Sequence, residues 1–212
     1  MEILLFFIRF LFFILLHVFK LLQNVDVQIL VFINHNRFKR LDGFFIFITD
    51  VATVITYSFP IILLLYAIFK HRFLLQRKSW LILISLTINS AIIDIIKNYV
   101  RRPRPFITHP EIHNLIPVFT SSFPSSHTAE VFMLATSFTL LFNSKKWWVV
   151  AAWIWAVIVA YTRMALGVHY PSDELGSIAI SVCLAFILNK FLIGLDFLKE
   201  NKISAAGLPA DE

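Results

Sequence analysis

Three short segments of the sequence concentrate residue types that bind and transfer phosphate. The first is residues 97–105, KNYVRRPRP, in which Lys97 and Arg104 stand seven positions apart, close to two helical turns. Several cations without matching acids indicate an anionic ligand, because the planar Arg guanidinium and the Lys ammonium both bind phosphate well. The alternative is a group of basic side chains that extend from a helix end toward lipid headgroups.

The second segment, residues 121–127 with the sequence SSFPSSH, is typical of a helix start. Pro124 beside hydroxyl residues marks an N-terminus, where free backbone N–H groups and the helix dipole favour an anion. Ser125 adds a hydroxyl donor, and His127 in the first turn can reach the same anion. Taken alone, the segment also fits an ordinary serine cap beside an interfacial histidine.

The third segment, residues 162–173 (TRMALGVHYPSD), supplies a further cation, Arg163, and a His–Asp pair. Pro171 predicts a helix start, which places His169 just before the helix and Asp173 in its first turn. An Asp beside a His can fix its tautomer and raise its nucleophilicity. The alternative is that the two side chains only satisfy each other in a loop.

Together the three segments predict phosphoryl transfer through a phosphohistidine. His169 would attack phosphorus while Asp173 orients and polarises it. His127 would protonate the leaving oxygen and then deprotonate the attacking water. The groups expected to hold the equatorial phosphate oxygens are Lys97, Arg104, Ser125 and Arg163.

The spacing of these residues resembles the three signature motifs of the type 2 phosphatidic acid phosphatase (PAP2) superfamily. Those motifs are Lys, six residues, Arg-Pro; then Pro-Ser-Gly-His; then Ser-Arg, five residues, His, three residues, Asp. The matching positions are Lys97, Arg104 and Pro105, then Pro124, Ser125 and His127, and finally Arg163, His169 and Asp173. Ser126 replaces the usual Gly and Thr162 the usual Ser. Ser126 adds a side chain beside the phosphate and keeps its backbone N–H for substrate binding.

The resemblance implies a lipid phosphatase that uses neither metal nor cofactor, on a compact chain like those of bacterial members. The acids near the motifs agree, because they lack a two-metal spacing and the region is net basic. Arg101 and Arg102 beside Arg104 add more charge than one phosphate monoester requires. The favoured substrates are lipid A 1-phosphate or undecaprenyl diphosphate, then phosphatidylglycerol phosphate, and last phosphatidic acid. A lipid-to-lipid phosphotransferase of the same family is the alternative.

The composition of the 212-residue chain predicts an integral membrane protein. Hydrophobic residues make up 58% and charged residues 15%, against about 45–50% and about 25% in soluble domains, and the mean hydropathy is +0.78. The single Cys183 excludes an intrachain disulfide framework. The net charge of +6 lies between apolar runs, which favours a lipid bilayer and an anionic lipid over nucleic acid.

Two other classes of membrane protein are alternatives to an enzyme. A transporter would spread its charges across the membrane depth, whereas here they gather at one end of the predicted helices. A lipid-binding protein without catalysis would not need the pair His127 and His169.

The hydropathy pattern predicts an all-α fold, a bundle of six transmembrane helices, since a span needs roughly 20 apolar residues. The predicted spans are residues 3–19, 44–69, 80–96, 128–142, 147–161 and 174–195. Apolar residues at helical spacing in residues 20–42 predict an interfacial amphipathic helix between the first two spans; a longer, tilted first helix is the alternative. Residues 1–203 are expected to form one domain, followed by a disordered tail or expression remnant at 204–212.

The basic loops predict the orientation of the bundle. With six spans both termini share one side, and nine Lys and Arg residues lie on that side against four on the other, the motif cations left aside. The positive-inside rule then places the termini in the cytoplasm. The motif segments are therefore expected to face the periplasm from a bacterial inner membrane.

Overall fold

The computed structural model describes residues 23–142 and 147–205, with side chains described as far as 191. These residues form helices and loops and no strand, so the all-α prediction is confirmed for them. A helix at residues 23–36 comes first. It is followed by η1 (Lys39–Leu41), α2 (Asp42–Phe69), α3 (Phe73–Val100), α4 (Pro105–Thr108), α5 (Ser126–Leu141), α6 (Trp147–Ala165) and α7 (Pro171–Ala205).

Four stretches of the described chain are long and apolar enough to cross a membrane. They are Lys39–Phe69, Phe73–Thr108, Trp147–Ala165 and Pro171–Phe191, and they correspond to the second, third, fifth and sixth predicted spans. The six-span layout as a whole stays a prediction. The first predicted span, residues 3–19, lies outside the described residues, as does the predicted tail from residue 206 onward.

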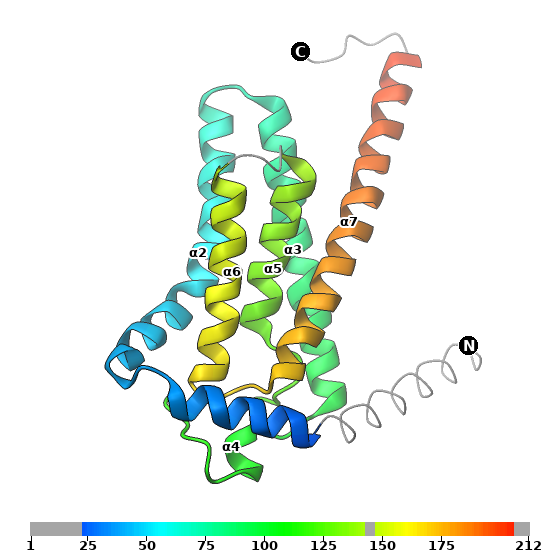
Figure 1. Ribbon diagram of the computed structural model, residues 1–212. Coiled ribbons are helices and arrows are strands. Elements are labelled where there is room, and N and C mark those ends of the chain that lie inside the picture. The colour runs from blue at the N-terminus through cyan, green and yellow to red at the C-terminus, as the bar shows by residue number, and fades with distance from the viewer. Residues whose placement is uncertain (1–22, 143–146, 206–212) are drawn as a thin grey trace, which may run out of the picture.

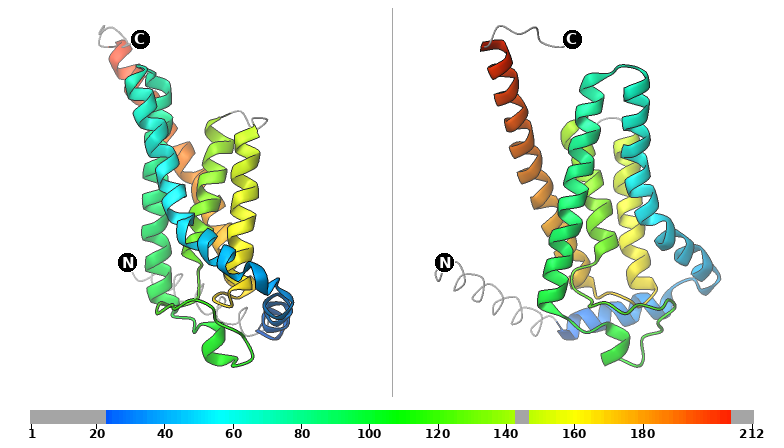
Figure 2. Two further views of the ribbon diagram at one scale, coloured as in Figure 1. Left: turned by 90° about the vertical axis from the view of Figure 1, so that its left-hand side faces the viewer. Right: turned by 180° about the vertical axis from the view of Figure 1, so that it is seen from behind.

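Helix α5, the fourth predicted span, is the central helix of the bundle. It has 16 residues, of which 12 are buried, and it packs against α2, α3, α6 and α7. Figure 1 shows it between α6 and α3. At about 24 Å it is shorter than the roughly 30 Å of a bilayer core. Neighbouring helices surround α5. Helix α3 extends past the N-terminal start of α5 (Figure 2), so this start lies inside the bundle.

The helix at residues 23–36 lies across one end of the bundle, at a steep angle to the other helices (Figure 1, deep blue). Its outward face exposes Val25, Ile29 and Phe32, while Asp26 and Asn34 are buried. The outward face is apolar as predicted, and the face toward the protein also buries an apolar residue, Leu30, against Ile112 and Tyr170. The position of this helix in a membrane interface stays a prediction.

Asn34 joins the helix at residues 23–36 to the end of α6 and to the loop before α5. The Asn34 amide donates to the backbone oxygens of His113 at 3.0 Å and Ala165 at 2.9 Å, and its oxygen accepts from the backbone N–H of His113 at 2.9 Å. Gly167 lies beside them with φ +74°, where a Cβ would sit 2.5 Å from the His113 oxygen. Only glycine permits that close approach without strain, so the α6–α7 loop can pack on the loop before α5.

Candidate active site

The three motif segments meet at the end of the bundle covered by the helix at residues 23–36. Lys97 lies in the last turn of α3, and Arg104 precedes α4. Ser125 is the N-cap of α5, and His127 lies in its first turn. As predicted, α7 begins at Pro171, with His169 before it and Asp173 in its first turn. Arg163 lies in the last turn of α6.

Arg104 and His169 are joined directly. Arg104 Nη1 lies 2.9 Å from His169 Nε2. The same guanidinium donates to the backbone oxygens of Val168 and Thr120, each at 2.8 Å, and to Thr120 Oγ1 at 3.0 Å. Because a guanidinium has donors and no acceptor, Nε2 must accept this bond, and the ring proton of a neutral His169 then lies on Nδ1.

Asp173 lies on the opposite side of the His169 ring. Its Oδ2 is 3.6 Å from His169 Nδ1, beyond hydrogen-bond length, and Nδ1 has no hydrogen-bond partner among the described residues. Asp173 is itself held by Ser122 Oγ at 2.5 Å and by the backbone N–H of Tyr170 at 2.9 Å. The carboxylate therefore faces the ring nitrogen that carries the proton.

The surroundings of His169 keep its ring neutral. Burial lowers the pKa of His169 well below 6.5, and the positive charges of Arg104, Arg163 and Lys97 lower this pKa further. A neutral imidazole with its proton on Nδ1 has its lone pair on Nε2, which is the form required of a nucleophile.

At the start of α5, the two serines have different partners. Lys97 Nζ donates to Ser126 Oγ at 2.9 Å, so the side chain that stands in the family's glycine position contacts the motif lysine. Ser125 is fully buried; its N–H donates to Ser177 Oγ at 2.6 Å, and its hydroxyl donates to Thr128 Oγ1 at 3.2 Å. Phosphate binding by Ser125 would require these internal bonds to be exchanged.

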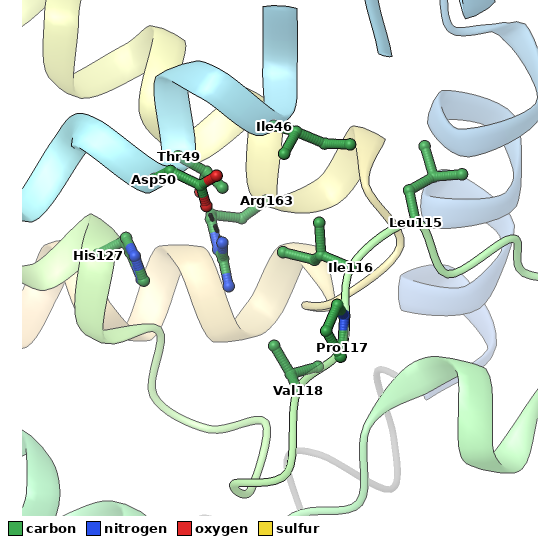
Figure 3. A pocket seen from close by; sticks show the side chains of 9 residues that line it. All are labelled: Ile46, Thr49, Asp50, Leu115, Ile116, Pro117, Val118, His127 and Arg163. Carbon is green, nitrogen blue, oxygen red and sulfur yellow. Dashed lines mark hydrogen bonds between the residues drawn. The ribbon is translucent and has the colours of Figure 1, made fainter. Parts of the chain in front are cut away.

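A pocket of about 510 Å³ opens beside Arg163 and His127 (Figure 3). Its polar lining also includes Thr49, which accepts a 2.6 Å hydrogen bond from Arg163 Nη1, and Asp50. The remaining walls are apolar: Ile46 and residues 115–118. A pocket with a cation and a histidine at one end and apolar walls suits a phosphate attached to a hydrocarbon chain.

Arg102 has a different role from the one expected of it. From its place in the sequence, Arg102 is expected to add positive charge for the substrate. In the structure it is buried, with Nη2 2.8 Å from Asp26 Oδ2 and Nη1 2.6 Å from Asp173 Oδ1, and it lies over the Tyr170 ring at 4.0 Å. Two acids neutralise it, so the charge argument for a diphosphate is wrong as far as Arg102 is concerned.

Two further acids lie in this region, Asp26, which no motif predicted, and Glu174, which was counted among the acids near the motifs without a role. Asp26 comes from the helix at residues 23–36, and its only sequence signal was an acid within an amphipathic pattern. Glu174 is buried beside Asp173 and hydrogen-bonds Thr128, which in turn contacts Ser125. Its signal was a second acid in the first turn of a helix that begins at the site.

Comparisons with known proteins agree with the motifs. Residues 78–194 match the PAP2 superfamily. The chain is 32% identical over 159 residues to the undecaprenyl-diphosphatase BcrC of Bacillus subtilis (71% of this chain, 75% of that protein). It is 31% identical over 166 residues to the lipid A 4′-phosphatase of Bacteroides thetaiotaomicron (73% and 71%). The crystal structure of a transmembrane PAP2-type phosphatidylglycerolphosphate phosphatase from Bacillus subtilis has the same fold, with a TM-score of 0.69, 23% identity and coverage of 86% and 92%.

Proposed function

Because the chain belongs to the PAP2 superfamily, a family of membrane lipid phosphatases, we propose that it hydrolyses a phosphorylated membrane lipid through a phosphohistidine on His169. The observation that carries this proposal is the arrangement around the His169 ring. Arg104 marks Nε2 as the lone-pair nitrogen, and Asp173 faces the protonated Nδ1.

In the first step, Nε2 of His169 attacks phosphorus and the bond from phosphorus to the lipid oxygen breaks. When the anionic phosphate binds beside it, His127 takes up a proton, which it then gives to that leaving oxygen. Arg104, Arg163 and Lys97 stabilise the charge that develops on the phosphoryl oxygens. Asp173 stabilises the positive charge that the His169 ring gains, since its carboxylate lies 3.6 Å from Nδ1.

In the second step, water attacks the phosphohistidine. His127, now neutral, removes a proton from the water, and the bond between Nε2 and phosphorus breaks. Inorganic phosphate leaves, and His169 regains its neutral form while His127 again carries its proton. The charge stabilisation in both steps comes from protein cations, so no metal is required.

The preferred substrate is undecaprenyl diphosphate or a lipid A phosphate, followed by phosphatidylglycerol phosphate and then phosphatidic acid. Support comes from the relatives, one named for undecaprenyl diphosphate and one for lipid A. The pocket adds a structural reason, because its apolar wall at residues 115–118 faces Arg163 and His127. We place the enzyme in a bacterial inner membrane with this pocket toward the periplasm.

A lipid-to-lipid phosphotransferase is the second candidate, because its first step would be the same. A lipid hydroxyl would replace water in the second step, and the apolar walls of the pocket suit such an acceptor.

The test is a phosphate-release assay in detergent with the four lipids, each with and without an unphosphorylated acceptor lipid and with excess EDTA. We expect release of free phosphate without acceptor, unchanged by EDTA, and no release by His169→Gln. Phosphate that appears only on the acceptor would establish the phosphotransferase. Loss of activity in EDTA with recovery on adding a divalent metal would contradict the metal-free mechanism.

A further inference from the structure

Asp26 is a buried acid outside the three motifs, and it contacts the third motif directly. Its Oδ1 accepts the backbone N–H of Ser172 at 2.9 Å, and its Oδ2 hydrogen-bonds the Ser172 hydroxyl. Oδ2 also accepts from Arg102 Nη2 at 2.8 Å. The helix at residues 23–36 thus places a negative charge at the start of α7, where the helix dipole favours it.

Arg102 links Asp26 to Asp173, the acid that faces His169. Its Nη1 donates to Asp173 Oδ1 at 2.6 Å and to Ser172 Oγ at 2.7 Å. The other carboxylate oxygen of Asp173, Oδ2, faces His169 Nδ1. The buried side chains therefore alternate in charge from Asp26 through Arg102 to Asp173.

The geometry of Arg102 decides which oxygen of Asp173 remains for His169. A guanidinium prefers to bind a carboxylate with two parallel N–H donors. Here Nη2 lies 2.8 Å from Asp26 Oδ2, and Nη1 lies 2.6 Å from Asp173 Oδ1. Oδ2 of Asp173 already accepts from Ser122 Oγ and from the backbone N–H of Tyr170. Without the Asp26 charge, a guanidinium that turns its second nitrogen toward Asp173 would compete with these donors for Oδ2 and would displace the carboxylate from His169.

We infer that Asp26 is a positioning residue: by holding Arg102 it keeps the Asp173 carboxylate oriented toward the nucleophile His169. The helix at residues 23–36 is therefore a part of the active site in addition to any role at the membrane surface. This inference rests on the proposed phosphatase function.

The test compares Asp26→Asn with a matched control, Asp42→Asn. Asp42 pairs with Arg37, with distances of 2.9 and 3.1 Å, just beyond the other end of the same helix. Both variants remove one acid that anchors this segment, but only Asp26 is linked to Asp173. We expect Asp26→Asn to lower kcat by about 10- to 100-fold with KM nearly unchanged, as for misplacement of a reacting group. Asp42→Asn should keep the wild-type kcat.

A double-mutant cycle separates positioning from a general loss of structure. If Asp26 acts through Asp173, adding Asp26→Asn to Asp173→Asn should cause little further loss of kcat. Rapid-quench labelling should show that Asp26→Asn slows formation of the phosphoenzyme. If Asp26→Asn does not fold, Asp26→Glu, which keeps the charge but displaces it by one methylene, takes its place in the cycle, and we again expect a lower kcat that is not additive with Asp173→Asn.

The outcomes distinguish the inference from the function on which it rests. If the wild-type protein releases no phosphate from any of the four lipids, the proposed function fails, and the inference fails with it. If the wild type is active, equal kcat values for the Asp26 and Asp42 variants would overturn the inference alone. Additive losses in the double-mutant cycle would do the same.

Discussion

Arg104 Nη1 donates a 2.9 Å hydrogen bond to Nε2 of His169, the atom that must attack phosphorus. This bond has two consequences. It selects the tautomer with the proton on Nδ1, and it occupies the attacking lone pair while no substrate is bound. An arriving phosphate offers Arg104 a stronger, charged acceptor. Transfer of the Arg104 donor to the phosphate would then free Nε2 beside the phosphorus.

The assignment of the two histidines predicts different defects. His169→Gln should lower kcat by more than about 10³-fold, as for loss of a nucleophile, and should form no phosphoenzyme. His127→Gln should still form some phosphoenzyme but should not hydrolyse it, because the attacking water has lost its base. Rapid-quench labelling measures both, since phosphohistidine is labile to acid and stable to base. Label that survives in His169→Gln would disprove the mechanism.

Arg104 should not be replaceable by lysine. Its guanidinium holds Thr120, Val168 and His169 at the same time, whereas a lysine offers one point charge on a flexible stem. We expect Arg104→Lys to lower kcat/KM by about 10²-fold, comparable to loss of one transition-state donor.

The control for Arg104→Lys is Arg101→Lys. Arg101 is exposed, and its side chain donates a local hydrogen bond to the backbone oxygen of Asn98 at 2.9 Å. This conservative change should leave kcat/KM near the wild-type value. Equal effects of the two substitutions would show that positive charge in this segment, rather than the fork of Arg104, is what matters.

The local features of the site were predictable from sequence, and the distant contacts were not. Pro171 correctly marked the start of α7, and Pro124 with the hydroxyl residues beside it marked the start of α5, because proline acts on helix initiation within one helical turn. The bond from Arg102 to Asp26 joins residues 76 positions apart, and no spacing or periodicity signals such a pair. Arg102 was therefore wrongly counted as charge for the substrate.

Hydropathy located α5 but not its place in the bundle. A helix surrounded by other helices and a helix surrounded by lipid both require apolar side chains. The central position of α5 follows instead from its burial on all sides. That position is what brings its N-terminus, with Ser125 and His127, among the ends of α3, α6 and α7.

Acidification should destabilise the protein in part through His169. The pKa of His169 is lowered in the folded state by burial and by Arg104, whereas in the unfolded chain it is about 6.5. The unfolded state therefore binds more protons below that pH, so this contribution is present above about pH 6.5 and decreases as the pH falls. The loss in the free energy of unfolding is up to about 1.4 kcal/mol per pH unit. For a chain of this size, each kcal/mol lowers Tm by roughly 2–4 °C.

Thermal unfolding in detergent between pH 7.5 and about 5 measures this effect. His169→Gln should show a smaller fall in Tm than the wild type, because glutamine takes up no proton; its lost bond to Arg104 adds only an offset that does not depend on pH. His71→Asn, at an exposed position in the turn between α2 and α3, is the control and should keep the wild-type slope. If Tm falls with pH equally in the wild type, His169→Gln and His71→Asn, then His169 is not a buried neutral histidine.

The orientation of the bundle predicts which loops an impermeant reagent reaches. Phe119, in the loop before α5, is 96% exposed and lies near the site, whereas His71 lies in the α2–α3 turn at the opposite end of the bundle (Figure 2). The basic residues around that turn favour the cytoplasm.

In a Cys183→Ser background, which removes the exposed native thiol, Phe119→Cys should be labelled by an impermeant maleimide in intact spheroplasts. His71→Cys should be labelled only after the membrane is permeabilised. The reverse pattern would place the site in the cytoplasm and would exclude substrates presented on the periplasmic surface.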